Sequence, residues 1–184
     1  MYQSSPALRG PLIEFLAAEF PAGIGRLLDI GTGYGLATAA IRARVPVGLC
    51  VGLEAWWPCV AAPAHRAPYD VIGMGDIRAS LPLVAWGTFD VVLALGVLEH
   101  LERTDALRVL GHARRIARQA VIAQVPIGPF PQGEVDGNPY TPHRSEWTRA
   151  DWEAQGGRLV AEFAASGLFV WKGGDACGAA GLRP

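Results

Sequence analysis

The sequence contains little that would tie the protein to a disulfide framework, a zinc site or a membrane. It has three cysteines, Cys50, Cys59 and Cys177, and no C-x-x-C pair. An odd number without that spacing argues against both a disulfide scaffold and a zinc site, and it fits a reducing cytoplasm. No apolar run approaches the roughly 18 residues that a membrane helix needs, and the first ten residues lack the order of a signal peptide. We therefore expect a cytoplasmic protein that does not bind a membrane.

An excess of charge of one sign is also missing. The sequence has 16 basic and 17 acidic residues, and Lys172 is the only lysine. The net charge of −1 gives no general attraction to nucleic acid or anionic membranes. Hydrophobic residues make up 51% of the 184 residues, which is enough to bury the core of one domain. We predict a single domain over residues 1–184, with an N-terminal helix within 1–23 and a flexible tail over 173–184.

The stretch from Arg26 to Thr38, RLLDIGTGYGLAT, organises the rest of the chain. An apolar run ends on Asp29, glycines follow at positions 31, 33 and 35, and a helical pattern begins at Leu36. This order predicts a buried strand, a tight glycine turn and a helix. Glycine allows positive φ and close approach of a ligand, and the free N–H groups at a helix start favour an anionic group. The third glycine of a dinucleotide-binding G-x-G-x-x-G loop would fall at Leu36, which disfavours a nicotinamide oxidoreductase.

Later strands end on residues suited to the same ligand. Glu54 follows the apolar stretch 47–53, about 20 residues after the glycine loop, where its two oxygens can accept hydrogen bonds from ribose hydroxyls. The alternative is a solvated carboxylate at a helix start. Asp76 follows the expected strand 69–74, and it is either a ligand-binding carboxylate or the acceptor of an Asx turn. The run FDVVLAL over 89–95, with Asp90 near its start, has the near-continuous apolar character of a strand buried on both faces.

The remaining pattern predicts alternating helices and strands. We expect helices over 36–44, 58–64 and 104–118, the last capped by Thr104, and a short helix from Thr148 to Gly156. We expect further strands over 26–30, 120–125, 158–163 and 168–172, the last two as a hairpin. The segment 126–147 has no such pattern and five prolines, which is typical of a functional loop over a binding site.

The pattern D-x-G-x-G-x-G, together with FDVV…LEHL, resembles the class I S-adenosylmethionine (SAM) methyltransferases over about residues 27–172. The resemblance implies a Rossmann-like α/β fold with a seven-stranded, mostly parallel sheet, an antiparallel last strand and helices on both faces. It also implies SAM as cofactor, with Asp76 near the adenine and Gly96 beneath the methionine part. The cofactor-binding residues that we predict are Asp29, Gly31, Thr32, Gly33, Gly35, Glu54, Ala55, Asp76, Ile77, Leu95 and Gly96.

The catalytic candidates are Glu99, His100 and His143. The first two follow the strand 89–95, and His143 lies in the loop 126–147 within PHRSEWTRADW. Either histidine could act as a general base near neutral pH. The alternatives are that His100 is a surface or capping residue of a helix and that His143 only holds the loop to the sheet.

A narrower resemblance, to small-RNA 3′-terminal 2′-O-methyltransferases, rests on the same three residues. Those enzymes bind a metal through Glu-x-x-Glu-His and a distant histidine, but the first of these positions is Gly96 here. We therefore assign no metal ligand, and the balanced charge makes nucleic acid an unfavoured partner. We predict a SAM-dependent methyltransferase that acts on a small-molecule acceptor at oxygen. The alternatives are a metal-assisted RNA 2′-O-methyltransferase and a non-catalytic SAM-fold binding protein.

Overall fold

The computed structural model describes residues 6–174. The tail expected over 173–184 lies outside the described residues from position 175 onward, and so does Cys177. The strands are β1 (Ile24–Ile30), β2 (Val47–Glu54), β3 (Val71–Met74), β4 (Phe89–Leu95), β5 (Ala117–Pro126), β6 (Arg158–Phe163) and β7 (Ser166–Lys172). The α-helices are α1 (Arg9–Glu19), α2 (Leu36–Arg42), α3 (Trp57–Ala61), α4 (Pro63–Arg66), α5 (Ile77–Ser80), α6 (Arg103–Ile116) and α7 (Arg149–Ala154). Short 3₁₀ helices are η1 (Pro6–Leu8), η2 (Leu81–Leu83) and η3 (Leu98–His100).

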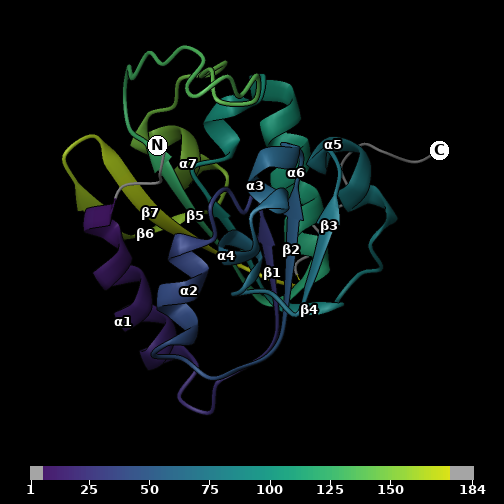
Figure 1. The fold of residues 1–184 in the computed structure, drawn as a ribbon. Helices are drawn as coiled ribbons and strands as arrows, with labels where there is room; N and C mark the ends of the chain where they lie inside the picture. The colour runs from purple at the N-terminus through teal and green to yellow at the C-terminus, as the bar shows by residue number, and fades with distance from the viewer. Residues whose placement is uncertain (1–5, 175–184) are drawn as a thin grey trace.

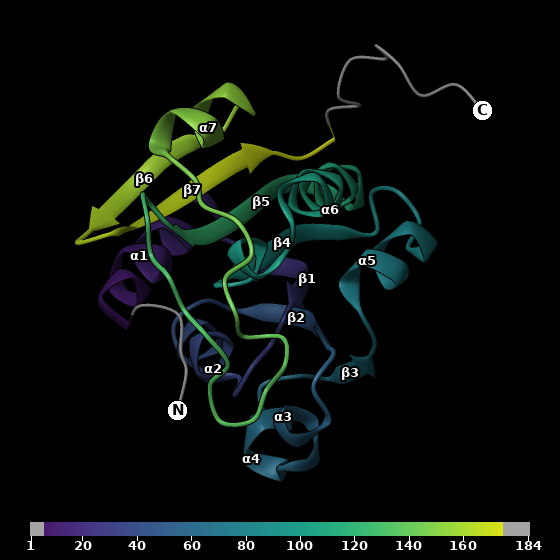
Figure 2. The same cartoon turned by 90° about the horizontal axis from the view of Figure 1, so that it is seen from above.

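Seven strands form one twisted sheet in the order β3-β2-β1-β4-β5-β7-β6. The pairs from β3 to β5 are parallel, and β7 is antiparallel to both β5 and β6. Helices cover both faces: α1 and α2 lie on one side, and α5 and α6 on the other (Figures 1 and 2). This arrangement confirms the predicted fold class.

Each face of the sheet has its own apolar core. On one face, Leu12 and Leu16 of α1 and Ile41 of α2 pack against the sheet. On the other face the core includes Ala113 of α6 and Trp152 of α7. A strand between two such cores must be apolar on both faces, which explains why β4 has the bounds that its continuous apolar run predicts.

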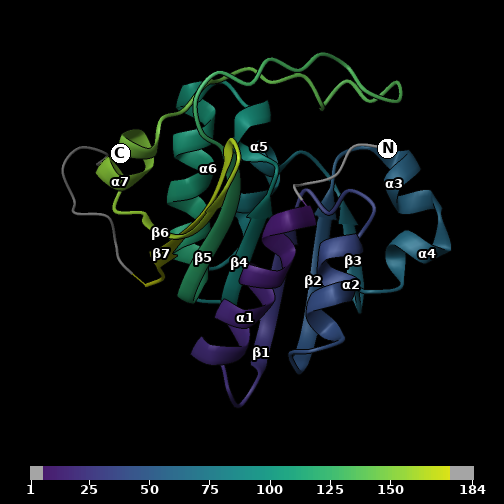
Figure 3. The same cartoon turned by 90° about the vertical axis from the view of Figure 1, so that its left-hand side faces the viewer.

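The register of the parallel strands brings their carboxyl ends to one edge. Ile30 lies opposite Leu53, and Glu54 lies opposite Met74. The connection from β5 to α7 crosses above this edge, from the α6 side toward α3 (Figure 3). Parallel sheets bind ligands at this edge, and here the edge is covered by the loop that the prolines predict.

Several predicted boundaries are wrong for identifiable reasons. The helix expected over 58–64 is broken into α3 and α4, because Ala62, which precedes Pro63, has an extended backbone with ψ 124°. Helix α6 begins at Arg103 without a side-chain cap, so Thr104 is not its cap. It ends at Ile116, which leaves Arg118 in β5. The hydroxyl of Thr148, by contrast, forms a capping box with Asp151 at the start of α7.

No helix within residues 6–174 combines the length and the apolar character needed to cross a bilayer. This agrees with the absence of long apolar runs in the sequence.

The buried aromatic cluster under α7 supplies a stability prediction. Trp152 is fully buried, stacks on Trp147 at 4.1 Å and meets Trp171 edge-on at 5.9 Å. Trp152→Ala should lower the free energy of unfolding by roughly 3–5 kcal/mol, because it removes a large packed side chain. Trp86→Ala, at a side chain that is 72% exposed, is the control and should cost less than about 1 kcal/mol. Chemical unfolding of both variants checks this, and equal losses would contradict it.

Candidate active site

The glycine loop connects β1 to α2 with an unusual backbone. Gly31, Gly33 and Gly35 all have positive φ, at 69°, 52° and 71°. A Cβ added at Gly31 would lie 2.6 Å from Cγ2 of Val97, whereas one added at Gly33 would meet nothing within 4 Å. The loop is therefore tightly packed at its start and open above Gly33, as a ligand cradle requires.

Asp29 holds this loop from beneath. Its Oδ2 accepts hydrogen bonds from the Thr38 hydroxyl and the Tyr69 hydroxyl, both at 2.6 Å. The carboxyl is 3% exposed, and burial raises its pKa to about 6 despite these two donors. A single carboxylate oxygen thus ties β1 to α2 and to the segment before β3.

Glu54 links the end of β2 to the glycine loop. Its Oε2 accepts from the Gly33 N–H at 2.8 Å and from the Thr32 hydroxyl at 3.4 Å. Its Oε1 accepts from the N–H groups of Ala55 and Trp56, at 2.9 and 2.8 Å. These bonds hold the carboxylate in one orientation. Glu54 lies at the rim of the site and is 6% exposed.

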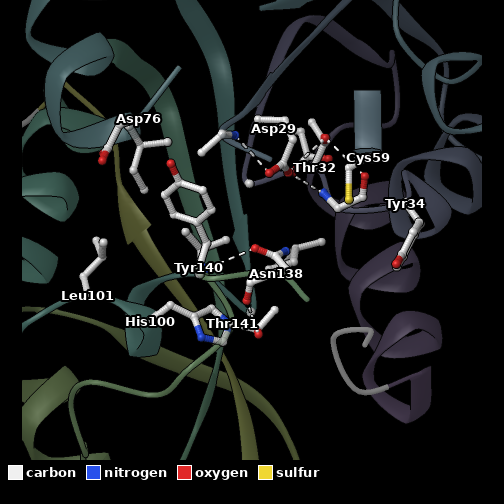
Figure 4. A pocket seen from close by; sticks show the side chains of 18 of the residues that line it. Asp29, Thr32, Tyr34, Cys59, Asp76, His100, Leu101, Asn138, Tyr140 and Thr141 are labelled. Carbon is white, nitrogen blue, oxygen red and sulfur yellow. Dashed lines mark hydrogen bonds between the residues drawn. The ribbon is translucent and has the colours of Figure 1, made fainter. Parts of the chain in front are cut away.

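A cavity of about 460 Å³ opens above the carboxyl ends of the strands (Figure 4). Its volume lies in the range of small-molecule sites. It brings together every predicted cofactor residue except Gly35, which caps α2 instead. The predicted residues that line it are Asp29, Gly31, Thr32, Gly33, Glu54, Ala55, Asp76, Ile77, Leu95 and Gly96.

Asp76 has a structural role as well as a place in the cavity. Its Oδ1 accepts from the Arg78 N–H at 2.8 Å, which caps α5. The Arg78 guanidinium also contacts both carboxylate oxygens, with Nε 3.0 Å from Oδ1 and 3.1 Å from Oδ2. This pairing holds the pKa of Asp76 below its usual range. The Asx-type turn considered from the sequence is therefore present, at a residue that also faces the cavity.

The three catalytic candidates come together although they are far apart in the chain. Glu99 and His100 lie in η3, and the main-chain carbonyl of Glu99 accepts from the N–H groups of Arg144 and Ser145 at 2.9 and 3.2 Å. These bonds bring His143 over η3, with the two imidazole centroids 4.9 Å apart. Of the three, His100 lines the cavity, whereas His143 lines a neighbouring one with Phe130.

Burial dominates the electrostatics of this cluster. Glu99 is 2% exposed, and desolvation raises its pKa to about 8. Burial and, to a smaller extent, nearby His143 lower the pKa of His100 to about 4. Burial also lowers the pKa of His143. The hydrogen bond from its Nδ1 to the Phe130 carbonyl, at 2.6 Å, partly opposes this shift. Both imidazoles are therefore neutral at pH 7.

The sequence predicts the loop but not the loop residues that reach the cavity. Asn138 folds it back on itself, with Oδ1 accepting from the Tyr140 N–H at 2.9 Å and its carbonyl from the Thr141 hydroxyl at 2.8 Å. Figure 4 shows Tyr140 projecting into the cavity from this turn. The only available signal was the NPYT sequence within a proline-rich loop. The cavity residues missed from the sequence include Arg9, Tyr34, Asn138, Tyr140, Thr141 and Arg144.

Comparison with known proteins identifies the family. Residues 28–123 match the methyltransferase domain family, and the chain belongs to it. This confirms the resemblance to class I SAM-dependent methyltransferases and, with it, SAM as the cofactor of this class of enzyme domain. The roles of individual residues stay predictions.

One curated relative and two solved structures illustrate the similarity. Acetylserotonin O-methyltransferase 2 of Oryza sativa subsp. japonica is 31% identical over 102 residues, which is 55% of this chain and 25% of that relative. The chain thus spans about a quarter of the length of this relative. The N-terminal domain of EvdMO1, solved in the presence of S-adenosylhomocysteine (SAH) and D-fucose, is 19% identical with a TM-score of 0.65, covering 92% of this chain and 84% of that one.

The second structure is a Burkholderia thailandensis N-methyltransferase. It is 1,6-didemethyltoxoflavin-N1-methyltransferase with bound 1,6-didemethyltoxoflavin and SAH. It is 19% identical with a TM-score of 0.65, covering 93% of this chain and 80% of that chain. At this identity the two structures support the fold alone.

The raised pKa of Asp29 predicts a pH dependence of stability. Because the folded pKa of about 6 lies above the ordinary aspartate pKa of 3.8, the fold favours the protonated form. The wild type should therefore lose stability, relative to Asp29→Asn, as pH rises from about 4 to 7, by at most about 3 kcal/mol. Chemical unfolding of both proteins at several pH values measures this difference. A difference that is constant with pH would contradict the burial argument.

Proposed function

We propose that the protein transfers a methyl group from SAM to a hydroxyl oxygen of a small molecule. One observation carries the proposal: a single cavity extends from the glycine loop, past Glu54 and Asp76, to His100 and the loop residue Tyr140. One end has the groups that suit a nucleoside with an amino-acid tail, and the other end has the imidazole of His100, which suits an acceptor.

The cofactor fits this cavity in one direction. The amino-acid end lies over the loop 31–35, where the space above Gly33 is open. The ribose lies against Glu54. A sugar hydroxyl takes the place of the Thr32 hydroxyl there, because the 3.4 Å contact from Thr32 is the longest of the four hydrogen bonds that Glu54 accepts. The adenine lies near Asp76 and the N–H of Ile77.

The acceptor lies at the other end, between Gly96, His100 and the turn 138–141. In the reaction the acceptor oxygen forms a bond to the methyl carbon, and the carbon–sulfur bond breaks with its electron pair left on sulfur. The products are a methyl ether, SAH and the hydroxyl proton. Alignment of the three reacting atoms supplies much of the rate, and the hydroxyl proton must be removed as the new bond forms.

Four features support a small acceptor and an oxygen nucleophile. The loop 126–147 closes over the site and narrows the space for a polymer. The net charge of −1 provides little attraction for RNA phosphates. The relative from Oryza sativa is named an O-methyltransferase, and a buried cluster of one carboxyl and two imidazoles is suited to activating a hydroxyl.

The first test is cofactor binding with and without Asp76. Calorimetry should show SAM and SAH binding to the wild type, and Asp76→Ala should weaken both on the order of 10- to 100-fold, or about 1–3 kcal/mol, through loss of a polar contact to the adenine. Asp105→Ala is the matched control, because Asp105 also pairs with Arg78, at 3.5 Å, but does not line the cavity. Its affinities should equal those of the wild type.

The outcomes separate the rival functions. Thermal unfolding shows whether Asp76→Ala keeps its fold despite losing the cap of α5. Unchanged affinity in a folded Asp76→Ala would contradict the adenine placement. No binding of SAM or SAH to the wild type would reject the proposed function. Binding without methylation across a panel of hydroxylated small molecules, followed by mass spectrometry, would favour a non-catalytic SAM-binding protein. Methylation of a small RNA at its 3′ end instead would favour the RNA enzyme.

A further inference from the structure

We propose that Glu99, His100 and His143 bind one divalent transition-metal ion at the acceptor end of the cavity. The binding of the ion stands on the geometry of these residues alone. Its action on the acceptor hydroxyl rests on the function proposed above. The proposal revises the expectation from the sequence, which assigns no metal ligand because Gly96 replaces one carboxylate.

The three residues offer ligand atoms in a compact group. One carboxylate oxygen and one nitrogen from each imidazole all lie within 4.8 Å of one another. Bonds of about 2.0–2.2 Å from nitrogen and oxygen to a metal place neighbouring ligand atoms roughly 3–4 Å apart. The longest separation in the group must therefore shorten by roughly 1 Å when an ion binds.

Two of these groups have buried polar atoms that the protein leaves unsatisfied. Oε2 of Glu99 and Nε2 of His143 are both buried and have no hydrogen-bond partner among the described residues. Buried polar atoms are almost always paired, so each exception calls for an explanation such as an ion. Two such atoms in one cluster, one of them on a carboxyl that is 2% exposed, are explained together by a shared cation.

The other nitrogen of each imidazole is directed at a main-chain carbonyl. Nδ1 of His143 lies 2.6 Å from the Phe130 oxygen, and Nδ1 of His100 lies 3.3 Å from the Pro142 oxygen. A carbonyl only accepts, so Nδ1 of His143 carries the proton and Nε2 of His143 presents its lone pair. Metal-binding histidines have this arrangement, in which an outer carbonyl fixes the tautomer and the ring orientation.

The loop is fastened so that its histidine stays in position. The His143 N–H donates to the Gln132 carbonyl at 2.9 Å, and the next two N–H groups donate to the carbonyl of Glu99. The same main chain that supplies one ligand is thus hydrogen-bonded to the residue that supplies another. Such preorganisation reduces the cost of forming the site.

The ligand types select the ion and leave room for substrate. Two imidazoles and one carboxylate favour zinc, cobalt, iron or manganese over magnesium or calcium, which prefer oxygen ligands. Three protein ligands leave a position open. His100 lines the cavity, so an ion held by the cluster would lie beside the acceptor end. It would lower the pKa of an acceptor hydroxyl bound to it, and the proton would pass to water.

Titration with Co²⁺, followed by its visible absorption, tests the site directly in the full-length protein after chelator treatment. The wild type should bind one equivalent, Zn²⁺ should displace it, and millimolar Mg²⁺ should not. Glu99→Gln and His143→Ala should each weaken binding at least about tenfold. His112→Ala, which removes a histidine of α6 outside the cluster, should bind Co²⁺ like the wild type. Bound Zn²⁺ should also raise the melting temperature of the wild type but not of His143→Ala.

The possible results are distinct. No Co²⁺ or Zn²⁺ binding to the wild type, or equal affinity in all four proteins, overturns the proposal. Circular dichroism checks the fold of each variant, and His143→Asn replaces His143→Ala if the latter unfolds. SAH calorimetry in chelator is the separate test of the methyltransferase function. Metal binding without SAH binding would reject that function and leave the metal site standing, whereas the reverse result would reject only the site.

Discussion

The shape of the site depends first on one buried carboxylate oxygen. Oδ2 of Asp29 accepts two hydroxyl hydrogen bonds, from Thr38 in α2 and from Tyr69 at the start of the β3 segment. The glycine loop lies between Asp29 and Thr38, so its positive-φ backbone is fixed at both ends. Burial raises the pKa of this carboxyl to about 6, which means that the two donors only partly offset the loss of water. The protein keeps an unfavourable buried acid because the loop geometry requires it.

A second constraint acts at the opposite end of the cavity. The carbonyl of Glu99 accepts two N–H groups of the loop 126–147, and Trp147, next along the chain, stacks on Trp152 in the core. These contacts hold the proline-rich loop 126–147 in place as one wall of the cavity. The parallel sheet forms the proposed cofactor end through its register, and the docked loop forms the proposed acceptor end through main-chain hydrogen bonds. The two ends therefore depend on different kinds of interaction.

This difference explains which parts could be predicted from the sequence. Strand β4 and the cofactor residues follow from apolar runs and from polar residues at strand ends, because parallel register brings those ends together. The break between α3 and α4 was missed although Pro63 marked it. The inward turn of Tyr140 and the approach of His143 to Glu99 depend on hydrogen bonds between distant loop residues, such as His143 N–H to Gln132. Periodicity carries no information on such bonds, and only the family resemblance brought the three residues together.

Gly96 lies between the two ends of the cavity, next to the cluster of Glu99, His100 and His143. Its N–H donates to the Gln124 carbonyl at 2.9 Å, and its φ of 73° turns the chain out of β4 toward η3. A carboxylate at this position would be available as a fourth protein ligand. Glycine supplies no ligand, so a metal held by the proposed cluster would keep a coordination position for an acceptor oxygen. The residue that weakens the resemblance to the RNA enzymes is thus compatible with the proposed three-ligand site.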